Sequence, residues 1–144
     1  MLNQSLNEKK VVIIDDEEGV LEMYKTKLES EGFKVLTALD GPAGIEIIKK
    51  EMPSVILLDI IMPKLNGFDV LNIIKSNQAT ADIPIILLTN LPKEAGEQKG
   101  HELKAAGYLV KAEYEPKVLA DMIKNLISRM SEWKDVKQKW QMKK

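Results

Sequence analysis

The stretch SVILLDIIMPKLNGFDVLNIIKS, residues 54–76, contains the unit that predicts the fold of the whole chain. It opens with a continuous apolar run, Ser54–Leu58, which is typical of a strand buried on both faces of a parallel sheet. It closes with Gly67–Ser76, whose apolar residues are spaced as one face of a helix. A strand followed by a covering helix is the building unit of an α/β protein.

The same alternation extends in both directions from this unit. The strands expected are Lys10–Ile14, Phe33–Ala38, Ser54–Leu58, Ile83–Leu88 and Tyr108–Val110, and the helices expected are Glu18–Glu31, Gly41–Glu51, Gly67–Ser76, Lys93–Ala106 and one that starts at Pro116. Five such units are typical of an α/β, doubly wound parallel sheet with helices on both faces, and they are too few for an eight-stranded barrel. The sequence therefore predicts one open sheet.

Two of the helices carry more detailed expectations. In the second helix, Ala43, Ile47 and Ile48 are expected to face the core. The fourth helix contains Gly96 and Gly100, and each glycine weakens a helix by about 1 kcal/mol relative to alanine. The fourth helix is therefore expected to be the weakest of the set.

Composition excludes several classes of site. The chain of 144 residues is 44% hydrophobic and 30% charged, which suits a single domain with a buried core. It contains no cysteine, which excludes disulfide scaffolds, cysteine-ligated zinc and iron–sulfur clusters. Its single histidine, His101, excludes sites built from several histidines. Any chemistry must therefore depend on carboxylates, hydroxyls, lysines or a bound ion.

Charge and hydropathy indicate which classes of partner and which cellular location to expect. No apolar run approaches the roughly 18 residues that span a membrane, and the start, MLNQSLNEKK, has no signal-peptide pattern, so a cytoplasmic protein with no membrane partner is expected. The net charge of −1 combines −5 over residues 1–127 with +4 over residues 128–144. Because the basic excess is confined to the end of the chain, no nucleic-acid partner is expected.

Polar residues follow four of the five predicted strands. They are Asp15 and Asp16 after the first strand, Asp59 after the third, Thr89 after the fourth and Lys111 after the fifth. Each of them alone has a simpler interpretation. An aspartate after a strand is often a helix N-cap, Thr89 could be a turn residue, and Lys111 could be a solvated lysine. The carboxyl ends of parallel strands share one edge, where open α/β sheets bind their ligands. The five residues are therefore expected to meet in one pocket.

The residue types in this pocket indicate phosphoryl chemistry. Clustered carboxylates repel one another unless a cation compensates them, and an all-oxygen site favours Mg²⁺ or Mn²⁺. The remaining ligands of such an ion are commonly phosphate oxygens. Asp59 can then act as a nucleophile that forms an aspartyl phosphate. Lys111 can neutralise the phosphoryl oxygens and Thr89 can donate a hydrogen bond to one of them.

Four motifs together resemble the receiver domain of two-component response regulators, the CheY-like superfamily. They are IIDDEE at 13–18, LLDIIMPKLNGFDVL at 57–71, IILLTN at 85–90 and GYLVKA at 107–112, within a resemblance that covers about residues 10–127. The resemblance implies a flavodoxin-like fold with strand order 2-1-3-4-5. It also implies that Asp59 accepts a phosphoryl group from the phosphohistidine of a sensor histidine kinase or a phosphotransfer protein. Such a protein is a phosphoacceptor that catalyses its own phosphorylation and dephosphorylation, and it is not otherwise an enzyme.

The resemblance also implies roles for individual residues. Asp16, Asp59 and the backbone carbonyl of Ile61 would ligate Mg²⁺, and Asp15 would hold a metal-bound water. Thr89 and Tyr108 match the family's switch pair, in which the hydroxyl moves toward the phosphoryl group and the aromatic ring turns inward.

Two positions depart from the family pattern. Ala112 follows Lys111 where the family usually has proline, and Asn90 follows Thr89 where a small residue is common. The first departure leaves the geometry of that loop open, and the second is expected to narrow access to the site.

The resemblance divides the chain into an N-terminal tail (1–9), a receiver domain (10–127) and a C-terminal extension of the last helix (128–144). No output domain fits in these residues, so a stand-alone type is expected that acts by contact with a downstream output protein. Alternating steps of four and three residues continue an apolar stripe into the extension, with Lys137 as its one polar position: Leu119, Ile123, Leu126, Met130, Trp133 and Trp140. This stripe makes a homodimer one expected state of the protein.

Two other functions share part of the pattern. A haloacid-dehalogenase-like phosphatase also uses an aspartate nucleophile, a threonine, a lysine and Mg²⁺, but its general acid/base aspartate should stand where Ile61 does. A degenerate, non-phosphorylated receiver that acts as a binding module is the other alternative. The complete set of three aspartates, threonine and lysine argues against it.

Overall fold

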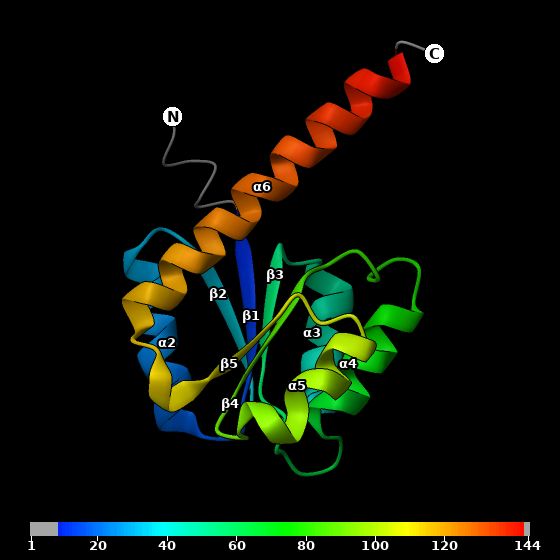
Figure 1. Cartoon of the computed structure of the whole chain (residues 1–144). Helices are drawn as coiled ribbons and strands as arrows, with labels where there is room; N and C mark the ends of the chain where they lie inside the picture. Colours follow the sequence, from blue (N-terminus) through cyan, green and yellow to red (C-terminus); the bar gives the residue numbers. More distant parts are fainter. Residues whose placement is uncertain (1–8, 143–144) are drawn as a thin grey trace.

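A five-stranded parallel sheet forms the centre of the computed structural model, which describes residues 9–142 (Figure 1). Its strands are β1 (Lys10–Ile14), β2 (Lys34–Ala38), β3 (Val55–Leu58), β4 (Ile85–Thr89) and β5 (Gly107–Val110). They lie in the order β2-β1-β3-β4-β5, and every neighbouring pair is parallel. The predicted flavodoxin-like α/β fold and its strand order are confirmed.

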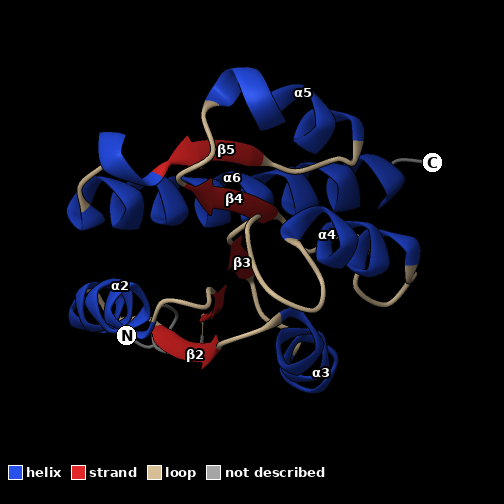
Figure 2. Ribbon diagram, turned by 90° about the horizontal axis from the view of Figure 1, so that it is seen from below, coloured by secondary structure: helices blue, strands red, loops and turns tan. Residues whose placement is uncertain are grey.

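Helices cover both faces of the sheet, as the alternation of the sequence predicts. They are α2 (Glu18–Ser30), α3 (Gly41–Glu51), α4 (Gly67–Ser76), α5 (Lys93–Glu102) and α6 (Pro116–Met142), with a short 3₁₀ helix, η1 (Lys111–Glu113), before the last. Helices α2 and α6 pack on one face, and α3, α4 and α5 on the other (Figure 2). Each strand thus lies between two helical layers.

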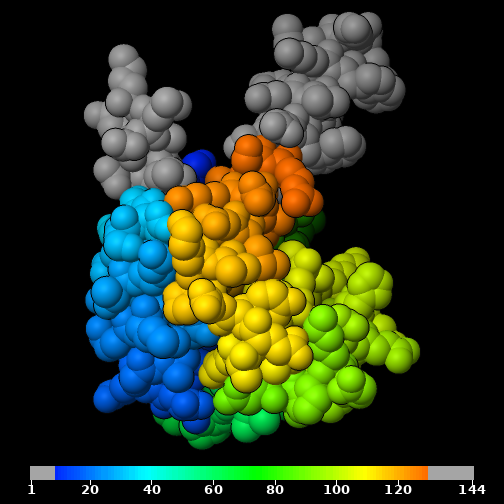
Figure 3. All heavy atoms as spheres, turned by 60° about the vertical axis from the view of Figure 1, so that its left-hand side comes forward, coloured from blue at the N-terminus to red at the C-terminus, as the bar shows by residue number. Residues whose placement is uncertain are grey.

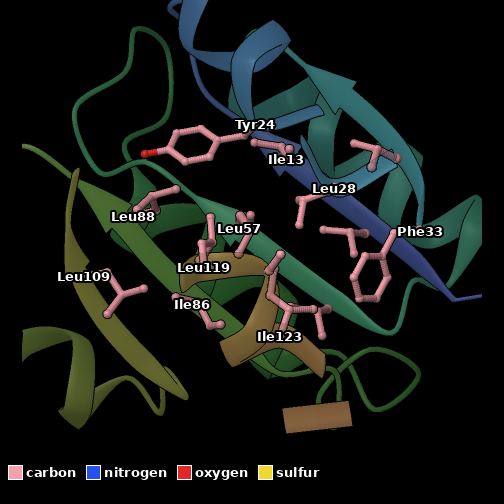
Figure 4. Close-up of a cluster of buried hydrophobic side chains, with 14 of the residues drawn as sticks. Ile13, Tyr24, Leu28, Phe33, Leu57, Ile86, Leu88, Leu109, Leu119 and Ile123 are labelled. Atoms are coloured by element: carbon pink, nitrogen blue, oxygen red, sulfur yellow. The ribbon is translucent and has the colours of Figure 1, made fainter. Parts of the chain in front are cut away.

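Alternate residues of the strands supply the two cores. In β1, Val11 and Ile13 face α2 and α6, whereas Val12 and Ile14 face α3. The first core is closed by side chains from α2 and α6 that meet β3, β4 and β5 (Figure 4). Because both faces of the sheet are covered, the central strands β3 and β4 are buried along their whole length, whereas the edge strand β2 begins at an exposed lysine.

The buried face of α3 differs from the expectation. Of the three residues expected to face the core, Ile48 is buried and Ile47 is partly buried against the core, but Ala43 is exposed. The other inward residues are Gly44 and Ile45, together with Gly41 at the start of the helix. A Cβ atom at Gly44 would lie 2.3 Å from the side chain of Ile14, so this helix approaches the sheet through its glycines. The periodicity of large apolar residues alone does not reveal such a face.

Helix α5 is shorter than predicted and ends at Glu102 instead of Ala106. Lys104 adopts a left-handed backbone with φ of 70°, and the amide of Ala105 turns back to donate to the Gly100 carbonyl at 2.9 Å. The amide of Ala106 then donates to Ile85 at 2.7 Å, so the chain is already joining the sheet. Strand pairing therefore ends the helix early.

Helix α6 continues well beyond the sheet on which its first half packs (Figure 1). Leu119, Ile123 and Ile127 are buried in the first core, and the helix lies beside α2 on this side of the molecule (Figure 3). The side chains of Met130, Trp133 and Trp140 lie outside the described residues, so the predicted apolar stripe there stays a prediction. Within residues 9–142, no helix is long and apolar enough to cross a membrane.

A carboxylate at the end of α2 joins that helix to α6. Glu31 accepts from Lys124 at 3.1 Å and lies 3.7 Å from Lys117 and 3.9 Å from Lys27. The hydrogen bond and charge of Lys124, with the two other lysines, lower the pKa of Glu31 below its ordinary 4.5. A carboxyl with a lowered folded pKa stabilises the fold above its unfolded pKa, and this stabilisation is lost as the pH falls through the folded value.

We expect Glu31→Gln to lower the thermal midpoint at pH 7 by about one to three degrees, as is usual for surface ion pairs. The difference from wild type should shrink as the pH falls below about 4.5. Thermal unfolding between pH 3 and pH 7 measures both effects. Glu29→Gln is the matched control, because this neighbour is exposed and has no ion pair within the described chain. An equal loss in the control, or a difference that does not depend on pH, would contradict the prediction.

Candidate functional site

The carboxyl ends of the strands place the predicted polar residues at one edge of the sheet. The hydrogen bonding between strands continues for one residue after β1 and β3, and these two residues are Asp15 and Asp59. The amide of Asp15 donates to Ala38 at 3.1 Å and that of Asp59 donates to Ile14 at 3.0 Å. These backbone bonds alone fix the two aspartates at the ends of neighbouring strands.

Lys111 joins the two aspartates through its ammonium group. Nζ lies 2.5 Å from Oδ2 of Asp15 and 3.1 Å from Oδ2 of Asp59, and it lies 3.9 Å from Glu17. Asp15 and Asp59 are only 2% and 5% exposed. Buried carboxylates require a compensating charge, and within this structure Lys111 supplies it.

The electrostatics of the site reflect this burial. Burial raises the pKa of Asp15 above its ordinary 3.8, although the hydrogen bonds from Lys111 and from the amide of Glu17 oppose the change. Burial alone would lower the pKa of Lys111, but its hydrogen bond to Asp15 and the charges of both aspartates raise it overall. Lys111 therefore stays an ammonium ion at neutral pH.

Four carboxylates offer oxygen atoms that all lie within 4.8 Å of one another: Asp15, Asp16, Glu17 and Asp59. Asp16 and Glu17 are exposed at the mouth of the site, and Asp15 and Asp59 are buried at its base. This all-oxygen set suits a hard divalent ion such as Mg²⁺ or Mn²⁺. Glu17 was not predicted from the sequence, although it directly follows the two aspartates.

The loop after Asp59 is fixed close to the site. Oδ1 of Asp59 accepts from the amide of Ile60 at 2.7 Å, and the amide of Gly67 donates to the Ile60 carbonyl at 2.8 Å. A Cβ atom at Gly67 would lie 2.3 Å from the Asp59 carbonyl oxygen. Ile61, two residues after Asp59, is 61% exposed.

Thr89 and Tyr108 each form a hydrogen bond with Leu91. Thr89 is fully buried at the end of β4, and its Oγ1 accepts from the amide of Leu91 at 3.2 Å. The Tyr108 hydroxyl donates to the Leu91 carbonyl at 2.8 Å and lies 3.4 Å from that of Pro92. The ring is buried, and burial raises the pKa of Tyr108. Tyr108 thus already points inward in this structure.

The glycines of α5 explain how the ring fits. A Cβ atom at Gly96 would lie 2.6 Å from the Tyr108 hydroxyl, and one at Gly100 would lie 2.7 Å from Leu87. The residues that the sequence marks as weak points of the helix are the ones that let it approach β4 and β5 closely.

We expect Gly96→Ala to destabilise the protein by about 1–2 kcal/mol, because the added methyl group displaces Tyr108 from its position. Helix propensity alone predicts the opposite sign, a gain of about 1 kcal/mol. Gly19→Ala is the control, since nothing lies within 4 Å of a Cβ atom there. Urea unfolding should show a loss for the first variant and no loss for the second. A gain for Gly96→Ala would show that the Tyr108 contact is unimportant.

The structure shows the positions of Ala112 and Asn90, the two residues that depart from the family pattern. Ala112 is exposed within η1, and every peptide bond in residues 9–142 is trans. Asn90 is exposed beside the buried Thr89. His101 is exposed on α5 and takes no part in the site.

Comparison with known proteins points to a single family. The family model described as "Response regulator receiver domain" matches residues 11–124. The probable transcriptional regulator ycf27 of Cyanophora paradoxa is 38% identical over 124 residues, which is 86% of this chain and 50% of that protein. This chain therefore spans about half the length of the curated relatives it matches.

Solved structures agree with this match. The chemotaxis protein CheY4 of Vibrio cholerae has a TM-score of 0.76 and 28% identity, covering 81% of this chain and 97% of that one. A CheY-like receiver domain protein from Methanospirillum hungatei has a TM-score of 0.79 and 25% identity, covering 86% and 97%.

Proposed function

Since the chain belongs to the response regulator receiver domain family, we propose that its Asp59 accepts a phosphoryl group from a phosphohistidine. The donor would be a sensor histidine kinase or a phosphotransfer protein, and transfer would take place in the cytoplasm. The observation that carries the proposal is the buried Asp59 carboxylate, held 3.1 Å from an ammonium group that also bonds Asp15. The receiver domain would comprise residues 10–127, with 128–144 as an extension of its last helix.

Each residue of the site has a separate role in the phosphoryl transfer. A carboxylate oxygen of Asp59 attacks phosphorus, the phosphorus–nitrogen bond breaks, and the histidine nitrogen keeps the electron pair. Lys111 compensates the negative charge of the phosphoryl oxygens, and Thr89 donates a hydrogen bond to one of them. Asp16, Asp59 and the Ile61 carbonyl would hold Mg²⁺ or Mn²⁺, and Asp15 would hold a water on it. The ion supplies further compensation of charge when it is bound.

The consequence of phosphorylation would be a change of protein contacts. Both Thr89 and Tyr108 bond to Leu91, so a movement of the Thr89 hydroxyl toward the phosphoryl group would release the Leu91 amide. Helix α5 follows directly and would report the change to a downstream output protein. A homodimer formed through the extension of α6 is the other contact we expect.

The two alternative functions are not favoured. A haloacid-dehalogenase-like phosphatase needs a carboxylate two residues after its nucleophile, and the exposed Ile61 is there instead. A degenerate receiver would lack part of the site, whereas Asp15, Asp59 and Lys111 are joined by contacts.

Intact-mass spectrometry after incubation with acetyl phosphate and Mg²⁺ tests the proposal. The wild-type chain should gain one phosphoryl group, and Asp59→Asn should gain none. Asp121→Asn is the matched control, since it removes an exposed aspartate on α6 and should leave labelling intact. EDTA or Asp16→Ala should reduce labelling sharply. A time course after removal of acetyl phosphate shows whether the chain also dephosphorylates itself. Labelling of Asp59→Asn would overturn the assignment of the phosphoacceptor.

A further inference from the structure

The loop between β3 and α4 carries Ile61, whose backbone carbonyl is a proposed cation ligand. Both ends of this loop are fixed. At its start the Ile60 carbonyl accepts from the amide of Gly67 at 2.8 Å. At its end Asn66 and Asp69 form a reciprocal capping box at the start of α4. Between these ends Met62 and Leu65 are partly buried against the second core, whereas Pro63 and Lys64 between them are exposed.

Lys64 holds an unusual backbone conformation in this middle part. Its φ is 70°, which L-residues other than asparagine and aspartate rarely adopt. The amide of Leu65 donates to the Pro63 carbonyl at 2.8 Å, so the chain makes a tight turn centred on Lys64. A conformation of this kind persists only where the surrounding structure supports it.

Besides this packing, Lys64 itself is supported by the neighbouring loop at the same edge of the sheet. Nζ of Lys64 lies 3.1 Å from Oδ2 of Asp40, and Oδ1 of Asp40 accepts from the amide of Ala43 at 2.9 Å. Asp40 is therefore held rigidly as the N-cap of α3 while it binds the lysine. A Cβ atom at Gly41 would lie 3.0 Å from the Cβ of Leu65, which shows how closely the two loops approach.

We propose that the Asp40–Lys64 ion pair is a positioning contact for the cation site. It would hold the turn that follows Ile61, so the affinity for a divalent ion would depend on two residues that do not touch the ion. The inference rests on the proposed function, because it takes the Ile61 carbonyl as a ligand.

The sign of one substitution separates positioning from a simple effect of charge. Lys64→Gln removes a positive charge near a cation site, so electrostatics alone predicts tighter binding of the ion. Positioning predicts weaker binding of the ion, because the turn loses its ion pair with Asp40. Asp40→Asn should weaken binding as well, and it retains the helix cap because asparagine caps as well as aspartate.

Titration of the full chain with Mn²⁺, with the free ion measured by electron paramagnetic resonance, provides the test. We expect Lys64→Gln and Asp40→Asn each to raise the dissociation constant about two- to fivefold, the range set by the strength of surface ion pairs. The double variant should have a dissociation constant no higher than that of the single variant that binds Mn²⁺ less tightly, because both substitutions remove the same contact. Lys64→Arg keeps the ion pair and should bind as the wild type does. Lys49→Gln, an exposed lysine on α3, is the control for charge.

Unchanged or tighter Mn²⁺ binding by Lys64→Gln would overturn the proposal, as would additive losses in the double variant. Urea unfolding of each variant shows whether folding itself is affected. Labelling of the wild type by acetyl phosphate distinguishes the two proposals. If Asp59 is not labelled while Lys64→Gln still weakens Mn²⁺ binding, the proposed function fails and the positioning contact stands.

Discussion

Lys111→Met should destabilise the protein by about 3 kcal/mol in the presence of EDTA. The substitution removes the charge that compensates Asp15 and Asp59, which are both almost completely buried. Breaking a buried ion pair by removing one partner costs about 3–5 kcal/mol, and protonation of Asp15, whose pKa is already raised by burial, reduces the loss. Urea unfolding measures the effect.

Addition of Mg²⁺ should increase the stability of the Lys111→Met protein. Without Lys111, the carboxylates lack a competing cation, so the ion should bind more tightly and restore part of the lost stability. Acetyl phosphate labelling should still fall sharply, because nothing then replaces the ammonium group at the phosphoryl oxygens. Lys49→Met, on an exposed position of α3, should change the stability by less than about 0.5 kcal/mol. Equal effects of the two substitutions would show that Lys111 is not the compensating charge.

Gly67→Ala should destabilise the protein by about 3 kcal/mol, at the upper end of the cost of overpacking. The new methyl group would lie 2.3 Å from the Asp59 carbonyl oxygen and 2.7 Å from the Cα of Ile60. Both contacts are with backbone atoms, so no side chain can rotate away to relieve them. The start of α4 and the residue after Asp59 must separate instead.

Labelling at Asp59 should fall together with the stability, because the Asp59 backbone is one of the groups that must move. Gly107→Ala is the matched control, since a Cβ atom there meets only Ile86 side-chain atoms at an ordinary 3.8 Å. Urea unfolding and intact-mass labelling of the two variants decide the matter. A Gly67→Ala protein with wild-type stability would show that this close approach is not required.

The sheet and the base of the site could be predicted from the sequence because both depend on order along the chain. Continuous apolar runs such as Val55–Leu58 form buried strands, and parallel strands bring whatever follows them to one edge. The contacts of Asp15 and Asp59 with Lys111 follow from that rule. Predicted strand ends were accurate to within two residues, the largest difference being at β4, which begins at Ile85 after Pro84.

The features that could not be predicted depend on contacts between distant segments. Gly44 and Gly96 are at close packing points, but a glycine in a helical pattern indicates only weakness until its neighbour is known. The end of α5 is set by strand pairing rather than by a local stop signal, and Lys104 takes a conformation typical of glycine. The ion pair between Asp40 and Lys64 joins residues 24 positions apart, and no local pattern indicates it.

The order of the strands also determines how the site is completed as the chain is made. Strand β1 pairs with both β2 and β3, so a nascent chain that has emerged as far as Leu58 already contains three adjacent strands. Domains generally fold as units, and in this one β4 and β5 follow β3 outward in chain order. The segments that carry Asp15 and Asp59 are therefore synthesised before Lys111, which follows the last strand of the sheet. The charge that compensates both buried aspartates is supplied only when the end of the fifth strand has joined the sheet.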